Sequence, residues 1–130
     1  MSTSAPTAAA SAISAGSSRA GSIRTEAIID TDAIAANTGV LLAALRRHRP
    51  DAQLMAVVKA DGYGHGMIPA AHAAVAGGAD WLGVVHEHEA LALRQAGITT
   101  RVLSLLGAPG GGHEAAIRGD VDLTDCACAD

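Results

Sequence analysis

The spacing of apolar positions alternates between two patterns from about residue 25 onward. Short continuous apolar runs, typical of buried parallel strands, alternate with stretches in which apolar residues recur at helical spacing. Strands are predicted at residues 25–30, 53–60, 80–85, 101–106 and 121–124, and helices at 31–49, 67–75, 87–96 and 113–118. Alternation of this kind indicates βαβ units and a parallel sheet. From residue 53 we predict an α/β fold of three strand–helix units followed by a fourth strand.

The first predicted helix has clear ends. Thr31 or Asp32 is expected to cap it, and Pro50 ends it. Its apolar positions share one predicted face and comprise Ile34, Thr38, Leu41, Leu42 and Leu45. Right-handed crossovers between the following strands would place the loop after each strand at the same edge of the sheet, where α/β proteins build their sites.

Composition separates a tail from a folded region. Residues 1–22 are rich in Ser, Ala and Thr and are predicted to form a disordered tail, so residues 23–130 form the expected domain. Hydrophobic residues make up 49% of the chain, but aromatic residues only 2%, so the core is expected to rest on Ile, Leu, Val and Met.

Charge and apolar runs narrow the class of protein. The net charge is −4 and no dense basic stripe is present, which disfavours nucleic-acid binding. No run approaches the ~20 apolar residues that span a bilayer, and no secretory signal is expected. Cys126 and Cys128 make no disulfide framework, so we expect a cytoplasmic protein.

A lysine stands where the second predicted strand ends. Lys59 is the only lysine of the chain and Tyr63 the only tyrosine, and Gly62, Gly64 and Gly66 lie around the tyrosine. Lys59 is either a surface lysine that extends its ammonium into solvent or an amine that its neighbours desolvate. A neutral amine forms a Schiff base with an aldehyde, and the amides of a glycine-rich turn can face phosphate oxygens.

Other polar clusters favour no metal site. His86 and His88 do not have the i, i+4 spacing of a zinc-binding helix, and the glutamates beside them suit the start of a helix. Cys126 and Cys128 lack a second cysteine pair. Three consecutive glycines at 110–112 are expected to form a flexible connection, and Trp81 is expected to lie in the core.

Residues 56–66, with the sequence AVVKADGYGHG, resemble the attachment motif for pyridoxal 5'-phosphate (PLP) in bacterial alanine racemases. Residues 29–37, 78–84 and 89–98 also resemble that family, and the resemblance covers roughly residues 25–124. It implies the N-terminal part of a PLP-binding (β/α)8 TIM-type barrel. The barrel would be incomplete, because a closed one typically needs ~250 residues.

The resemblance also implies an activity and a site. The activity is interconversion of L- and D-alanine for peptidoglycan precursors, with alanine as substrate, PLP as cofactor and a homodimer as the intact assembly. Lys59 corresponds to the lysine that forms the Schiff base and acts as the base on one face of the substrate. Tyr63 corresponds to the tyrosine that hydrogen-bonds the cofactor phosphate.

Racemisation needs acid–base groups on both faces of the substrate. In the family, the second group is a tyrosine from the C-terminal domain of the partner subunit, and this chain contains no second tyrosine. We therefore expect a truncated alanine racemase that does not racemise alone. Two alternatives remain open: another racemase or decarboxylase on a PLP barrel, or a non-catalytic βα remnant that self-associates through exposed strand edges.

Overall fold

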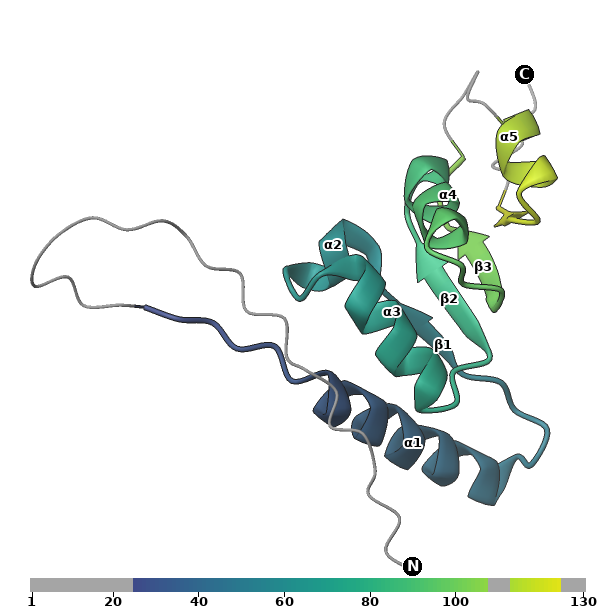
Figure 1. The fold of residues 1–130 in the computed structure, drawn as a ribbon. Coiled ribbons are helices and arrows are strands. Elements are labelled where there is room, and N and C mark those ends of the chain that lie inside the picture. The colour runs from purple at the N-terminus through teal and green to yellow at the C-terminus, as the bar shows by residue number, and fades with distance from the viewer. Residues whose placement is uncertain (1–24, 108–112, 125–130) are drawn as a thin grey trace, which may run out of the picture. The chain divides into compact units, whose positions relative to one another are not determined.

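The computed structural model describes residues 25–107 and 113–124 (Figure 1). Residues 1–22, the glycines at 110–112 and both cysteines lie outside the described residues, so the predictions made for them stay predictions. Within 25–30 no helix or strand is present, and the strand predicted there is wrong. The described sheet consists of β1 to β4 and does not include this segment.

Helices and strands alternate from residue 31 onward, as the apolar spacing predicts. The elements are α1 (Thr31–His48), β1 (Met55–Val57), α2 (Lys59–Tyr63), α3 (Met67–Ala76), β2 (Trp81–Val84), α4 (Glu87–Gln95), β3 (Arg101–Ser104), α5 (His113–Arg118) and β4 (Asp122–Leu123). Helix α1 begins at Thr31, so the N-cap residue, which precedes the first helical residue, is neither Thr31 nor Asp32. The predicted cap is therefore wrong. The short α2 was not expected.

The four strands form one parallel sheet in the order β1-β2-β3-β4. Met55 pairs with Trp81, which pairs with Arg101, and Leu103 pairs with Asp122. Each strand therefore adds beside the previous one, with a helix in each connection. This arrangement confirms the predicted α/β fold class and the three strand–helix units followed by a strand.

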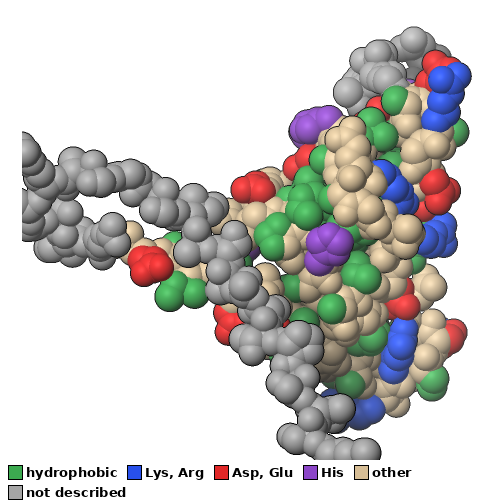
Figure 2. Space-filling model, viewed as in Figure 1, with side chains coloured by type: hydrophobic (Ala, Val, Ile, Leu, Met, Phe, Trp, Pro, Cys, Tyr) green, Lys and Arg blue, Asp and Glu red, His purple; other side chains and the backbone are tan. Residues whose placement is uncertain are grey.

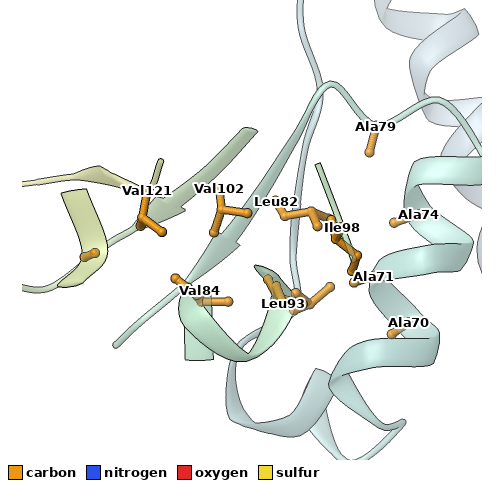
Figure 3. Packing of buried hydrophobic residues seen from close by; sticks show 13 residues of the cluster. Ala70, Ala71, Ala74, Ala79, Leu82, Val84, Leu93, Ile98, Val102 and Val121 are labelled. Atoms are coloured by element: carbon orange, nitrogen blue, oxygen red, sulfur yellow. The ribbon is translucent and has the colours of Figure 1, made fainter. Parts of the chain in front are cut away.

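The core lies between the sheet and the helices of the connections (Figure 3). Leu82, Val84 and Val102 of the central strands are fully buried, as is Leu93 of α4. Small side chains complete the cluster, namely Ala70, Ala71, Ala74, Ala79, Ala90 and Ala116. Because alanine contributes so little volume, the helices lie close to the sheet, and the few Leu, Ile and Val side chains fill the space that remains.

Among residues 25–107 and 113–124, helices cover one face of the sheet and leave the other partly exposed. In β3 the burial alternates, with Val102 and Ser104 buried, Arg101 exposed and Leu103 partly exposed. Val57 in β1 is 37% exposed. The apolar run around β1, which is predicted to be a buried parallel strand, is therefore only partly buried among the described residues. Trp81 likewise lies outside the buried core and stacks under the Arg101 guanidinium, 3.7 Å from the ring centroid.

Helix α1 packs closely against the end of α3. A Cβ atom added at Gly77 would lie 2.3 Å from the backbone oxygen of Ala35, so only glycine fits this contact. Thr38, on the same part of α1, is buried and donates its hydroxyl to the Ile34 carbonyl. Leu41 is 61% exposed, so the apolar face predicted for α1 is only partly buried.

Two arginines join elements at the amino-terminal edge of the sheet. Arg46 donates to both oxygens of Asp80, and Asp80 accepts the backbone N–H of Leu54 at 2.8 Å. These contacts connect the end of α1 to the starts of β1 and β2. Arg94 donates to four backbone carbonyls, those of Ile98, Thr100, Gly119 and Asp120, and so joins the loops before β3 and β4.

Candidate active site

Lys59 lies at the carboxyl-terminal edge of the parallel sheet, where the loops after β1 and β2 lie side by side. Strand β1 ends at Val57, and the Val58 N–H still donates to Gly83 of β2 at 2.9 Å. Lys59 is half-buried and begins α2. The prediction that the strand extends through Lys59 to Ala60 is therefore wrong, although Lys59 does lie at the predicted edge.

The backbone after Lys59 forms a left-handed turn. Ala60, Asp61, Gly62 and Tyr63 have φ values of 51°, 54°, 62° and 56°. Residues other than glycine are disfavoured in this conformation by about 1–2 kcal/mol each, and it normally occurs as single residues. Such strain persists only where surrounding contacts hold it, and it is concentrated at functional sites.

Several hydrogen bonds hold this turn. The Gly62 N–H donates to the Val58 carbonyl at 2.9 Å. The Asp61 carboxylate accepts the N–H of Met67, the first residue of α3, at 2.8 Å. His65 Nδ1 lies 2.9 Å from the Gly62 carbonyl oxygen. Asp61 and His65 thus fix the path of the chain from the turn into α3.

The turn places the two predicted site residues together. The Lys59 Nζ atom lies 5.9 Å from the centroid of the Tyr63 ring, within the range of a cation–π contact. Tyr63 is 59% exposed, and apart from Gly64 and its two chain neighbours no atom of the described residues lies within 4 Å of the position that a Cβ at Gly64 would take. An amine and a phenol therefore share an open surface of the turn, where a ligand can approach the backbone closely.

Glu89 is a further residue of this edge, and the sequence did not single it out. Its Oε1 accepts the Ala60 N–H at 3.0 Å, and its Oε2 accepts those of Val85 and His86 at 2.9 and 3.1 Å. Burial raises the pKa of Glu89, but the donors at His86, Ala60 and Val85 outweigh it, so the pKa lies below the ordinary value of 4.5. The only signal in the sequence was a glutamate in the first turn of a helix.

The histidines near this edge make other contacts. The rings of His86 and His88 stack with centroids 5.4 Å apart, and His113 Nδ1 contacts the Glu87 carboxylate. Among residues 25–107 and 113–124, no three His, Cys, Asp or Glu side chains are grouped to hold a metal ion. No helix within those ranges is long and apolar enough to span a membrane.

Charged side chains are dispersed over the face of the molecule that Figure 2 shows. On the face shown in Figure 2, Lys and Arg side chains of the described residues lie among Asp and Glu side chains and form no continuous basic area. A hollow of about 200 Å³ lies behind the turn, between α1, β1 and α3. Alanine, valine and isoleucine form most of its wall, so the hollow offers little to a charged ligand.

The fold and this edge define a parallel β/α protein with a lysine and a tyrosine on a glycine-rich turn after its first strand. The sequence model of the family described as "Alanine racemase, N-terminal domain" matches residues 29–125. The chain therefore belongs to the alanine racemase family, of which it contains the N-terminal part of the barrel domain.

Individual relatives agree with that assignment. An alanine racemase of Frankia casuarinae is 54% identical over 110 residues, which cover 85% of this chain and 28% of the relative. The solved structure of an alanine racemase from Streptomyces coelicolor has a TM-score of 0.64 and 48% identity over 73% of this chain and 25% of that one. That of Bacillus anthracis with bound L-Ala-P has a TM-score of 0.66 and 38% identity, covering 75% and 24%. The chain spans about a quarter of the length of these relatives.

Proposed function

We propose that this domain supplies the PLP lysine of an alanine racemase, an enzyme that interconverts L- and D-alanine. The observation that carries the proposal is the pairing of Lys59 and Tyr63 on a strained left-handed turn at the carboxyl edge of the sheet. Ligand sites of parallel α/β proteins lie at this edge. The names of the relatives support alanine as the substrate.

The residues of the turn fit PLP. Lys59 offers the single side-chain amine of the chain to the cofactor aldehyde, and the exposed phenol of Tyr63 offers a donor to its phosphate. The open space outside Gly64 admits a bulky group next to the backbone. Bound PLP would serve as the electron sink that makes the substrate Cα–H acidic.

The protein residues have separate tasks. Lys59 would hold the cofactor through its aldehyde carbon, and its amine would take or return the substrate Cα proton on the face where the lysine lies. Tyr63 would hold the cofactor by its phosphate. The left-handed turn orients both side chains toward one surface, and the contacts of Asp61 hold that turn. A tyrosine of a partner subunit in a cytoplasmic homodimer would complete the acid–base pair and serve cell-wall precursor supply.

Titration of the chain with PLP, followed by absorbance, tests the cofactor assignment. We expect saturable binding by the unsubstituted chain and about tenfold weaker binding by Tyr63→Phe, the factor that corresponds to loss of ~1.4 kcal/mol. Pyridoxal, which lacks the phosphate, should bind both proteins equally weakly. Equal affinity of PLP and pyridoxal for the unsubstituted chain would contradict the role given to Tyr63.

Assay of D-alanine formation tests the two-base argument. We expect the 130-residue chain with PLP to show no turnover of L-alanine, because its single tyrosine is assigned to the phosphate. Robust racemisation by the chain alone would show that another of its own side chains serves as the second acid–base group.

A further inference from the structure

The strongest feature beyond Lys59 and Tyr63 is the carboxylate of Glu89, which joins two strand-end loops. One oxygen accepts the N–H of Ala60, directly after Lys59, at 3.0 Å. The other accepts the N–H groups of Val85 and His86, after β2, at 2.9 and 3.1 Å. Glu89 itself belongs to the first turn of α4. One side chain therefore connects the loop that bears the lysine to the neighbouring strand and helix.

The contact with Ala60 is not needed to cap α4. Capping at the helix start is accomplished by the oxygen that accepts the N–H groups of Val85 and His86. The other oxygen reaches 29 positions back along the chain, to a residue with φ 51° and ψ 51°. An alanine in the left-handed conformation is disfavoured. The hydrogen bond that its N–H donates to an ionised carboxylate therefore stabilises a conformation that the residue would not adopt alone.

The charge of Glu89 suits this task. Burial alone would raise its pKa, but three backbone donors hold the pKa below 4.5, so the group is ionised at neutral pH. An ionised carboxylate accepts on both oxygens, whereas a carboxamide accepts on one and presents N–H donors on the other. A glutamine at this position can therefore satisfy one loop but not both.

We propose that Glu89 is a positioning residue that fixes the direction of Lys59 by holding the Ala60 N–H. The inference rests on the proposed function for the role of Lys59, but the contact itself is tested without cofactor. Glu89→Gln is the test variant. Glu87→Gln is the matched control, because Glu87 lies in the same helical turn and contacts His113 instead of Ala60.

The first measurement is the amide of Ala60 by NMR in the absence of PLP. In Glu89→Gln we expect its proton resonance to move upfield and its hydrogen exchange to become about tenfold faster or more, corresponding to ~1.4 kcal/mol. Exchange at the buried Val102 should change little, which separates a local effect from general loss of stability. Unchanged Ala60 exchange relative to Val102, or the same change in Glu87→Gln, would overturn the proposal.

The second measurement is PLP affinity. We expect Glu89→Gln to bind PLP about tenfold more weakly than Glu87→Gln. Equal affinities would show that the Ala60 contact does not position Lys59. If the unsubstituted chain binds no PLP, the proposed function fails, while the Ala60 amide still decides whether Glu89 holds the turn. If Glu89→Gln does not fold, Glu89→Asp, whose shorter side chain keeps the charge but cannot span both loops, is measured in the same way.

Discussion

Ala60 and Asp61 adopt a backbone conformation that is uncommon for either residue type, and they do so immediately after the lysine. The strain is offset by polar contacts from three directions: the Val58 carbonyl, the Met67 N–H and the Glu89 carboxylate. A flexible glycine-rich loop would leave Lys59 free to sample many directions. A strained turn held by these hydrogen bonds instead gives the Lys59 amine one preferred direction, which a covalent cofactor site requires.

Ala60→Gly tests this strain directly. Glycine adopts positive φ without the Cβ penalty, so we expect the free energy of unfolding to rise by up to about 1 kcal/mol. Ala36→Gly, at an exposed position inside α1, is the control and should lower it by about 0.5–1 kcal/mol. Urea unfolding of both variants measures whether each substitution raises or lowers the free energy of unfolding. A loss of stability in both would contradict a strained Ala60.

The lowered pKa of Glu89 predicts a pH-dependent stability. A carboxyl whose folded-state pKa lies below its ordinary value of 4.5 stabilises the fold above that value, and the contribution is lost as pH falls through the folded-state pKa. The unsubstituted chain should therefore exceed Glu89→Gln in unfolding free energy at neutral pH, and the difference should shrink as pH falls below 4.5.

Urea unfolding at several pH values measures this difference. Glu114→Gln is the control, because its carboxylate pairs with Arg118 on the exposed surface, where a pair contributes about 0–1 kcal/mol. A difference between the unsubstituted chain and Glu89→Gln that stays constant across the acidic range would contradict the assignment.

At the residue scale, the sequence singled out Lys59 and Tyr63 as candidate site residues, because their types are unique in the chain and stand near glycines. It did not locate Glu89, because the contact with Ala60 depends on how the turn after β1 meets the start of α4, 29 positions along the chain. It also did not predict the left-handed turn, since neither Ala60 nor Asp61 has a local preference strong enough to indicate it.

At the scale of elements, α3 is the helix that carries the chain away from the turn, and its packing depends on small residues. Ala71 and Ala74 are buried toward the core, and Gly77 after the helix allows α1 to approach. Because its side chains are small, α3 packs closely against both the sheet and α1. The position of α3, and with it the capping contact from Asp61, therefore depends on the absence of a side chain at Gly77.

Gly77→Ala is expected to destabilise the fold. The added Cβ would lie 2.3 Å from the Ala35 carbonyl oxygen and 2.7 Å from Thr38 Cβ, so the backbone must shift, at a cost of about 1–3 kcal/mol. Gly39→Ala is the matched control, since its Cβ would meet only the Gly77 oxygen at an ordinary 3.6 Å and alanine favours the helix. Thermal unfolding compares the two. Equal effects would mean that α1 and α3 are not closely packed.

Most elements could be predicted from apolar spacing, because the helices of the connections bury one face each. The helix predicted at 113–118 and the one at 67–75 agree with α5 and α3 within one residue. The strands were predicted too long, because the apolar residues Val58 and Leu105 follow β1 and β3 and their N–H groups still donate to β2, at Gly83 and Val84. Periodicity alone does not separate residues in a sheet from apolar residues just beyond it.

At the scale of the whole molecule, four parallel strands carry helices on one face and leave the other face partly exposed, with Arg101, Trp81 and Val57 on it. The family match and the TM-scores place this sheet at the start of a barrel domain. The matched part of this chain corresponds to about a quarter of each relative's length. On the proposed function, this edge would form one side of a larger active site. Lys59 and Tyr63 would supply its cofactor lysine and its phosphate contact, and the opposite acid–base group is proposed to come from a partner.

The most direct test of this account is the site of covalent PLP attachment. The chain has only two kinds of free amine, the Lys59 side chain and the N-terminal α-amino group. Incubation with PLP, reduction with borohydride and peptide mass spectrometry will show which of them is modified. We predict that the adduct forms on Lys59 at low PLP concentration and disappears in Lys59→Ala. Modification confined to the α-amino group, or none at all, would contradict the central claim that this turn is a PLP site.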